Sequence, residues 1–291
     1  MFHGSIVALV TPFREDALDE RAFQRLIAWH LEEGTQGFVP VGTTGESPTL
    51  SHPEHERVIE LCVEAVGGRA PVIAGTGSNS TEEAISLTRH AKRAGADAAL
   101  VVTPYYNKPT QEGLYAHYRA IHDAADLPIV IYNIPGRSVV DMTPETMGRL
   151  AKLPNIVGVK DSTADIVRPL LTREACGAEF CQLSGEDANV VAFLAHGGDG
   201  CISVTANVAP RLCAQLHAAW RAGRPAEALA LHRRLLPLHQ ALFCETSPAP
   251  AKHALSRLER CGAEVRLPLV QLGERSRARV DAALEAVGLA D

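Results

Sequence analysis

Short apolar runs alternate with longer amphipathic stretches over most of the chain. The runs are rich in valine and isoleucine and are bounded by glycine, proline and polar residues, which is the pattern of buried β-strands. The predicted strands are Ile6–Val10, Phe38–Val41, Val72–Ala74, Ala98–Val102, Ile129–Tyr132, Ile156–Lys160, Phe180–Ser184 and Cys201–Val204. Between them, apolar positions recur at helical spacing. The predicted helices are Asp19–Leu31, Pro53–Val66, Thr81–Arg93, Gln111–Ala124, Pro144–Lys152, a stretch near 164–174, and Ala188–His196.

This alternation predicts a parallel sheet that is buried on both faces by its crossover helices. Eight strand–helix units in about 220 residues match a closed (β/α)8 barrel, which typically needs about 250 residues. The fold class is therefore predicted to be α/β, a (β/α)8 TIM barrel. Periodicity alone leaves an open doubly wound sheet as the alternative.

The pattern changes from Pro225 onward. Helical stretches follow one another there with no strong strand between them, over residues 225–243, 248–260 and 276–287. We therefore expect a barrel catalytic domain over residues 1–224 and a C-terminal α-helical extension over residues 225–291.

The composition narrows the class of protein. Hydrophobic residues make up 46% and charged residues 21% of the 291 residues, as in a well-packed globule. The net charge is −6 and no basic stretch interleaves with aromatic residues, so no nucleic-acid partner is expected. No stretch approaches the roughly 20 apolar residues that a membrane span needs, so no membrane association is expected.

Three local features bear on location and metal binding. The segment Met1–Phe13 has an apolar core but no basic start, so it is predicted to be a strand and not a signal peptide. The seven cysteines show no Cys-x-x-Cys spacing, which predicts reduced thiols in a cytoplasmic protein. The sequence His52-Pro-Glu-His55 has neither the spacing nor the third ligand of a zinc site, so no metal is expected.

Catalytic side chains of barrel enzymes lie at the carboxyl ends of the strands. Lys160 ends the run Ile156–Lys160, where its stem would pack against apolar walls. Burial disfavours the ammonium form of a lysine, and a neutral amine can attack a ketone to form an imine. Taken alone, a solvated lysine at a strand end is the commoner interpretation.

Polar residues that follow other runs would face the same pocket. Tyr132 could exchange protons with a nascent imine, and Arg137 could bind a carboxylate through two nitrogens. Thr43 and Thr44 could relay protons or bind a carboxylate through their backbone N–H groups. The plainer alternatives are a tyrosine at the edge of the core, a solvated arginine and ordinary turn residues.

Seven motifs follow the predicted strands in order. They are Gly-Thr-Thr-Gly-Glu-Ser (42–47), Gly-Thr-Gly-Ser-Asn (75–79), Thr-Pro-Tyr-Tyr-Asn (103–107), Tyr-Asn-Ile-Pro-Gly-Arg (132–137), Val-Lys-Asp (159–161), Leu-Ser-Gly-Glu-Asp (183–187) and Ile-Ser-Val-Thr-Ala-Asn (202–207). Together they resemble the dihydrodipicolinate synthase family of class I, pyruvate-dependent aldolases. The likeness runs from Phe2 to near the C-terminus, and any one motif alone would be weak.

The resemblance implies condensation of pyruvate with L-aspartate 4-semialdehyde to 4-hydroxy-tetrahydrodipicolinate, the first committed step of lysine and diaminopimelate biosynthesis. It implies that Lys160 forms a Schiff base with pyruvate. It also implies that Tyr132, Thr43 and Tyr106 form a proton relay. Tyr106 would reach the neighbouring subunit's site, which implies a homodimer that usually pairs into a homotetramer. The covalent imine implies that no metal or organic cofactor is needed.

The resemblance further implies how the substrates are held. Thr44 is similar to the residue that binds the pyruvate carboxylate. Arg137 is similar to the residue that receives the carboxylate of aspartate semialdehyde at the entrance of the site. Gly185 and Ile202 are similar to positions that line the pocket through their backbones.

A regulatory site for lysine as feedback inhibitor is also implied. The matching positions are His52, His55, Asn79, Glu83 and Tyr105. Glu83 would suit an ammonium group and Asn79 an α-carboxylate, although polar residues at helix starts are the plainer interpretation. Pro48 departs from the small residue expected in the family, and it removes an N–H donor from the loop.

Three other functions share parts of this pattern. Another pyruvate aldolase, such as N-acetylneuraminate lyase or a 2-keto-3-deoxy-sugar-acid enzyme, would share the loop, the tyrosine and the lysine. Against it, Tyr105, Tyr106 and Arg137 favour an acidic amino-aldehyde. A non-catalytic amino-acid-binding or scaffold barrel would have no need for Lys160, Tyr132 and Thr43 together. A metal-dependent class II aldolase would need a ligand cluster that the sequence lacks.

Overall fold

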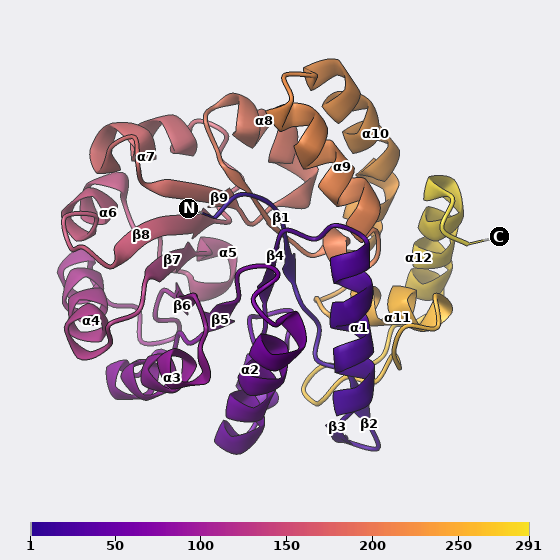
Figure 1. Cartoon of the computed structure of the whole chain (residues 1–291), viewed down its shortest axis with the longest axis horizontal. Helices are drawn as coiled ribbons and strands as arrows, with labels where there is room; N and C mark the ends of the chain where they lie inside the picture. The colour runs from indigo at the N-terminus through magenta and orange to yellow at the C-terminus, as the bar shows by residue number, and fades with distance from the viewer. Residues whose placement is uncertain (1, 291) are drawn as a thin grey trace.

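The computed structural model describes residues 2–290, and eight parallel strands form its central sheet (Figure 1). The strands are β1 (Gly4–Ala8), β4 (Gly37–Val39), β5 (Ile73–Gly75), β6 (Ala98–Val102), β7 (Ile129–Asn133), β8 (Ile156–Asp161), β9 (Cys181–Ser184) and β10 (Gly200–Ser203). Their order is β4-β1-β10-β9-β8-β7-β6-β5. The two end strands meet through a parallel bridge between Phe38 and Val72. The prediction of a (β/α)8 barrel is confirmed, and the open sheet is excluded.

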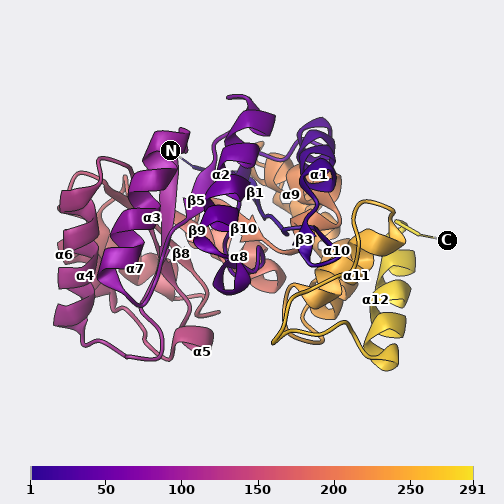
Figure 2. The same ribbon diagram turned by 90° about the horizontal axis from the view of Figure 1, so that it is seen from below.

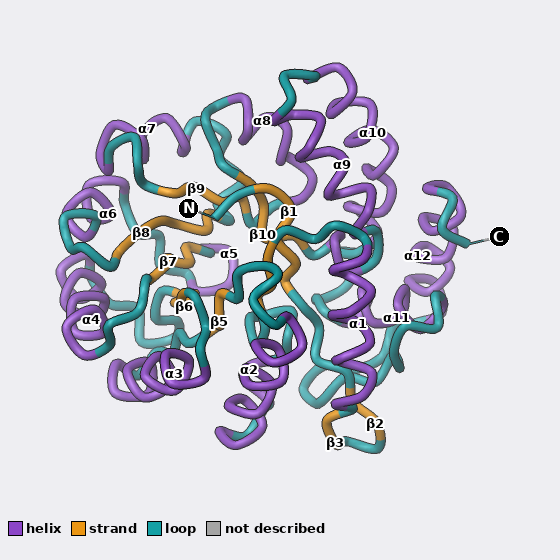
Figure 3. Tube along the Cα trace, in the orientation of Figure 1, coloured by secondary structure: helices purple, strands orange, loops and turns teal. Residues whose placement is uncertain are grey.

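Helices surround the barrel, as Figure 3 shows in purple around the orange strands. They are α1 (Glu20–Glu32), α2 (His52–Val66), α3 (Thr81–Ala94), α4 (Gln111–Ala124), α6 (Pro144–Leu150), α7 (Arg168–Cys176), α8 (Val190–Ala195) and α9 (Pro210–Arg221). The Ser51 side chain accepts from the backbone N–H of Glu54 and begins α2 as a capping box. None of the helices within residues 2–290 is long and apolar enough to cross a membrane.

Some elements differ from those that the sequence pattern predicts. The helix expected near residues 164–174 begins at Arg168, after a loop in which Ala164 is left-handed. Helix α9 is not among the predicted helices. Short elements also form in the connecting loops. They are the hairpin strands β2 (Phe13–Arg14) and β3 (Ala17–Leu18), the helix α5 (Pro135–Ser138) and the 3-10 turns η1 (Ser47–Thr49), η2 (Asp187–Asn189) and η3 (Thr205–Asn207).

A helical extension follows the barrel, as predicted. It consists of α10 (Pro225–Ala241), α11 (Ala249–Arg257) and α12 (Glu274–Val287). Figure 2 shows α11 and α12 at one end of the molecule, with α10 between them and the barrel helix α9. Apolar side chains of the extension, among them Leu235 and Leu284, belong to the same buried cluster as those of the barrel. The division into two domains at residue 224 stays a prediction.

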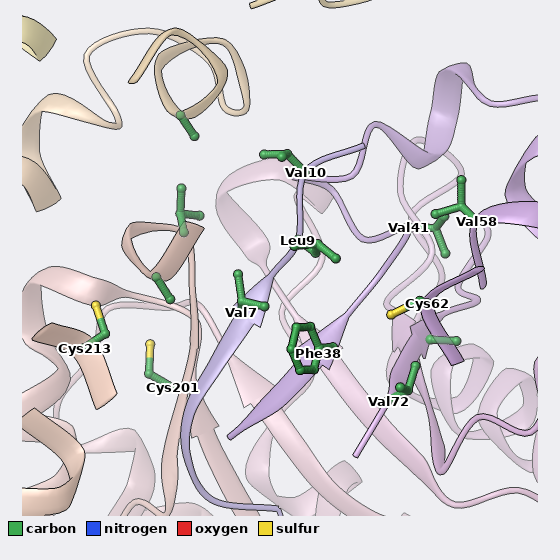
Figure 4. Close-up of a cluster of buried hydrophobic side chains, with 14 of the residues drawn as sticks. Val7, Leu9, Val10, Phe38, Val41, Val58, Cys62, Val72, Cys201 and Cys213 are labelled. Carbon is green, nitrogen blue, oxygen red and sulfur yellow. The ribbon is translucent and has the colours of Figure 1, made fainter. Parts of the chain in front are cut away.

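Alternate residues of the strands fill two different parts of the core. Ile6 and Ala8 of β1 belong to the cluster inside the barrel, together with Tyr132. Val7 and Leu9 belong to the outer cluster between strands and helices, part of which Figure 4 shows. Because both faces of each strand are buried, the strands are mostly apolar and do not alternate between apolar and polar residues.

Candidate active site

Lys160 and Tyr132 lie side by side at the carboxyl ends of neighbouring strands. They are paired in register between β8 and β7. The Nζ atom of Lys160 lies 4.0 Å from the centroid of the Tyr132 ring. Only 7% of Lys160 and 5% of Tyr132 is exposed. The structure therefore places the amine of Lys160 against the aromatic ring of Tyr132 at a buried position.

The next residue of each strand points the opposite way and fixes this register. The Asn133 side chain donates to the Asp161 carboxylate over 3.3 Å and accepts from the backbone N–H of Met142 over 3.0 Å. The guanidinium of Arg168 lies 3.9 Å from the same carboxylate of Asp161. Polar contacts behind the barrel wall thus hold the strand ends that carry the amine and the phenol.

Gly185 leaves the space into which the Lys160 side chain extends. A Cβ atom at this position would lie 2.9 Å from Cε of Lys160 and 1.9 Å from Oγ of Ser162. The backbone N–H of Gly185 donates to the carbonyl of Asp161 over 2.7 Å, so the backbone is held in place. A side chain at this position would therefore displace the lysine.

The substitution Gly185→Ala is expected to impair the imine formation that the resemblance implies for Lys160. A shift of about 1 Å in a reacting group can cost about 10²-fold in rate, so kcat/KM for pyruvate should fall by about that factor. Steady-state kinetics measures this effect. Gly273→Ala is the matched control, because its nearest neighbour would be 3.8 Å from the new Cβ. Equal kinetics for the two variants would contradict the crowding argument.

Thr43 and Thr44 lie on the loop 42–47 that follows β4. The loop turns back on itself, because the N–H of Gly45 donates to the carbonyl of Gly42 over 3.0 Å. Gly45 packs so closely on the chain that a Cβ there would lie 2.9 Å from the backbone nitrogen of Val41. Thr43 is half-buried and Thr44 is buried. This tight turn places Thr43 at the cavity that Tyr132 also lines.

A cavity of about 450 Å³ opens at the carboxyl ends of β4, β5, β6 and β7. Thr43, Tyr132 and Arg137 line it, and Lys160 adjoins it through its contact with Tyr132. Arg137 is exposed on the short helix α5 at the rim. Thr44, Gly185 and Ile202 are not among the lining residues. Ile202 is fully buried inside the barrel.

Tyr106 lies outside this cavity. Its backbone is left-handed, with φ 68°, and 90% of the residue is exposed. Such a conformation is uncommon for a bulky residue and requires support from its surroundings. The neighbouring Asn107 side chain donates to the carbonyl of Asn79 over 2.8 Å and ties this loop to the β5–α3 loop. Within one chain, the structure does not bring Tyr106 to Tyr132.

The residues of the implied regulatory site gather at the outer end of the same cavity. His52, His55, Glu83 and Tyr105 line it. The imidazole of His52 lies 2.9 Å from the Glu83 carboxylate, which also accepts from the Ser78 hydroxyl. These hydrogen bonds lower the pKa of Glu83, so it is ionised at neutral pH.

Two further members of this group are held differently. His55 is buried, neither of its ring nitrogens has a partner among the described residues, and burial lowers its pKa to about 4. Asn79 donates to the backbone carbonyl of Tyr105 over 3.3 Å and does not line the cavity. Among residues 2–290, no group of three or more His, Cys, Asp or Glu side chains is arranged to hold a metal ion.

A buried lysine and a tyrosine at neighbouring strand ends, next to a cavity, are typical of a (β/α)8-barrel enzyme that works through a covalent imine. A model of the dihydrodipicolinate synthetase family matches residues 1–287. The chain belongs to this family.

Individual relatives resemble the chain over nearly its whole length. The 4-hydroxy-tetrahydrodipicolinate synthase of Rhodospirillum centenum is 69% identical over 99% of both chains. The crystal structure of the chloride-inhibited dihydrodipicolinate synthase from Acinetobacter baumannii, complexed with pyruvate, is 46% identical with a TM-score of 0.97, over 99% of this chain and 100% of that one. The dihydrodipicolinate synthase from Cyanidioschyzon merolae with lysine bound is 40% identical with a TM-score of 0.95, over 99% of both chains.

Proposed function

We propose that Lys160 carries the imine through which this chain condenses pyruvate with L-aspartate 4-semialdehyde to 4-hydroxy-tetrahydrodipicolinate, the first committed step of lysine and diaminopimelate biosynthesis. The Rhodospirillum relative is named for this synthase activity. The observation that carries the assignment of Lys160 is its buried amine, 4.0 Å from the ring centroid of Tyr132. The enzyme is a lyase that acts in the cytoplasm.

The chemistry follows from the reactivity of the imine. The amine of Lys160 adds to C2 of pyruvate, and loss of water gives the imine. A proton then leaves the methyl carbon C3, because the imine nitrogen accepts the electron pair as an enamine forms. C3 adds to the aldehyde carbon. The amine of the second substrate then adds to C2 and displaces Lys160, which closes the ring and frees the enzyme.

Imine formation and release move protons between the amine and the carbinolamine oxygen, enamine formation removes a proton from C3, and the addition step delivers a proton to the former aldehyde oxygen. The phenol of Tyr132 is the general acid and base for these transfers, because it lies against Lys160. Thr43 lines the same cavity and passes protons onward. Tyr106 completes the relay in the partner subunit of a homodimer, where its exposed ring is available. Two such dimers form a homotetramer.

The two carboxylates of the substrates need separate partners. Backbone and hydroxyl groups of Thr44 bind the carboxylate of pyruvate at the tight turn after β4. Arg137, exposed at the cavity rim, binds the carboxylate of aspartate semialdehyde. The backbone of Gly185 adjoins the Lys160 side chain and Ile202 lies inside the barrel, so both flank the pyruvate end of the site without lining the cavity. The imine nitrogen itself serves as the electron sink, so the mechanism uses no metal or organic cofactor.

Substrate selectivity tests the proposed reaction directly. Turnover of pyruvate with aspartate semialdehyde is expected, followed through a coupled NADPH-dependent reductase that consumes the product. Cleavage of N-acetylneuraminate or of 2-keto-3-deoxy-sugar acids should be absent, because Arg137 and Tyr105 line the cavity and favour a short acidic aldehyde. Efficient sugar-acid cleavage without synthase turnover would refute the assignment. Full activity in a chelator would separate the reaction from that of a class II aldolase.

A second proposal concerns the outer end of the cavity, where free lysine binds as a feedback inhibitor. The ionised carboxylate of Glu83 suits the ammonium group of lysine, and His52, His55 and Tyr105 surround it. Asn79, on the adjoining loop, suits the α-carboxylate of the ligand. Pro48 lines the same cavity but has no N–H to donate. The Cyanidioschyzon relative is described with lysine bound.

Saturating lysine is therefore expected to lower turnover and to raise the melting temperature, since a ligand that binds only the folded state stabilises it. Glu83→Gln should weaken both effects. Glu112→Gln is the matched control, because Glu112 is an exposed carboxylate that pairs with Arg149 away from the cavity. If lysine changes neither turnover nor melting temperature, the regulatory proposal is withdrawn.

A further inference from the structure

We propose that Lys252 and Glu46 are positioning residues, through which the C-terminal extension holds the Thr43–Thr44 loop in its catalytic geometry. The inference rests on the proposed function, since it assumes that this loop acts on pyruvate. Glu46 ends the loop after β4, and Lys252 lies on α11, 206 positions further along the chain. From the sequence alone, neither residue is assigned a role in the site, although Glu46 lies in the motif 42–47.

The ion pair is sealed from solvent. The side chain of Lys252 is 0% exposed and that of Glu46 is 1% exposed, with Nζ 2.5 Å from Oε1. The second carboxylate oxygen of Glu46 accepts from the backbone N–H of Arg266 over 3.0 Å. Nζ of Lys252 also donates to the carbonyl of Glu264 over 2.8 Å and lies 4.1 Å from the centroid of the Phe13 ring. Two groups of the extension, the Lys252 amine and the Arg266 N–H, thus converge on one carboxylate.

The bound carboxylate of Glu46 constrains the backbone of the loop that carries Thr43 and Thr44. Glu46 is left-handed, with φ 56°, a conformation that costs energy for a residue with a side chain. Its N–H donates to the carbonyl of Thr43 over 3.2 Å. The preceding carbonyl, of Gly45, accepts from the Thr11 hydroxyl over 2.7 Å. Fixing the Glu46 side chain therefore constrains the Gly45–Glu46 peptide group and, through the Glu46 N–H, the Thr43–Thr44 peptide group.

The extension also contacts the end of the segment 46–54, which begins at Glu46. The guanidinium of Arg266 donates to both carboxylate oxygens of Glu54, over 2.6 and 2.9 Å, and to the carbonyl of Thr49 over 3.0 Å. This pairing lowers the pKa of Glu54 to about 2. One short stretch of the extension, Glu264–Arg266, thus contacts the beginning and the end of the segment 46–54.

The folding stability that a buried ion pair contributes does not by itself explain the Lys252–Glu46 pair. Two charges removed from water lose their hydration, and apolar side chains of similar size often give equal or greater stability. Burial accordingly lowers the pKa of Lys252, although Glu46 opposes the shift. What an apolar pair would not supply is a directed hydrogen bond to a loop residue in a strained conformation. We infer that the directed contact, rather than its energy, is what the enzyme uses.

Lys252→Met tests the inference. This substitution removes the amine that binds the Glu46 carboxylate, so the loop 42–47 is expected to shift. As a result, kcat/KM for pyruvate should fall by about 10²-fold in fully folded protein. Leu284→Ala is the matched control, because Leu284 is a fully buried residue of the same extension on α12, which packs against α10 and α11. It should lower the melting temperature while kcat/KM per folded site stays at the wild-type value.

The double variant Glu46→Gln with Lys252→Met separates positioning from stability, because it leaves no unpaired buried charge. We expect its melting temperature to recover while kcat/KM for pyruvate stays low, even if Lys252→Met alone fails to fold. Recovery of kcat/KM together with stability would overturn the proposal, as would a folded Lys252→Met with wild-type kinetics. Wild-type protein is assayed in parallel. If the wild type itself shows no turnover, the proposed function is refuted, whereas a loss confined to the variants concerns the Lys252–Glu46 pair.

Discussion

Replacement of Lys160 by alanine is expected to abolish turnover of pyruvate with aspartate semialdehyde. The chain has five lysines, and only Lys160 and Lys252 are buried. The amine of Lys252 is occupied by Glu46 and the Glu264 carbonyl, whereas that of Lys160 lies beside Tyr132 at the cavity. No second buried amine is therefore placed to form the imine. The measurement is steady-state turnover in the coupled reductase assay.

Lys160→Arg is the control for this result, because it keeps a cation at the strand end but offers no amine that forms an imine. Both variants should remain folded, since the side chain is surrounded by a rigid barrel wall and makes no buried ion pair. Far-ultraviolet circular dichroism and melting temperature check this point. Turnover by either variant at a rate near that of the wild type would rule out the assignment of Lys160.

The second large effect is expected for Tyr132→Phe. The ring stays in the inner cluster, so the fold is kept, but the proton donor next to Lys160 is lost. Removal of a general acid and base typically costs about 10²- to 10⁴-fold in rate, and we expect kcat to fall within that range. The pyruvate imine should still form on long incubation, because Lys160 is intact. Rapid-quench kinetics measures imine formation, and steady-state kinetics measures turnover.

Tyr118→Phe is the matched control for the loss of a phenol. Tyr118 is fully buried on α4, and its hydroxyl donates to the carbonyl of Val101 over 2.7 Å. Its removal should lower stability, because a buried carbonyl loses its partner, but it should leave kcat unchanged. A loss of kcat that is equal in both variants would show that the effect of Tyr132→Phe is structural.

Much of the fold follows from local patterns in the sequence. Strands buried on both faces give continuous apolar runs, and glycine or a polar cap marks most helix ends, so the alternation predicts the barrel. The barrel then places every strand end on one rim. This is why Lys160 and Tyr132, which the sequence places at the ends of two successive strands, lie opposite each other in the β7–β8 register.

Contacts between distant segments have no such local signal. Lys252 looks like an ordinary charge on a predicted helix, and its partner Glu46 is 206 positions away. The hairpin β2–β3 and helix α5 are too short to give a periodic pattern. The role proposed for Tyr106 requires a neighbouring subunit, and the proposed regulatory site requires a ligand, so neither follows from the folding of one chain.

The imine on Lys160 is the central claim, and trapping it is the most direct test. The protein is incubated with pyruvate, reduced with borohydride and digested, and the modified peptide is identified by mass spectrometry. We predict a single adduct on Lys160, whose yield falls when aspartate semialdehyde is added before reduction. No adduct, or an adduct on Lys252 or another of the five lysines, would contradict the account.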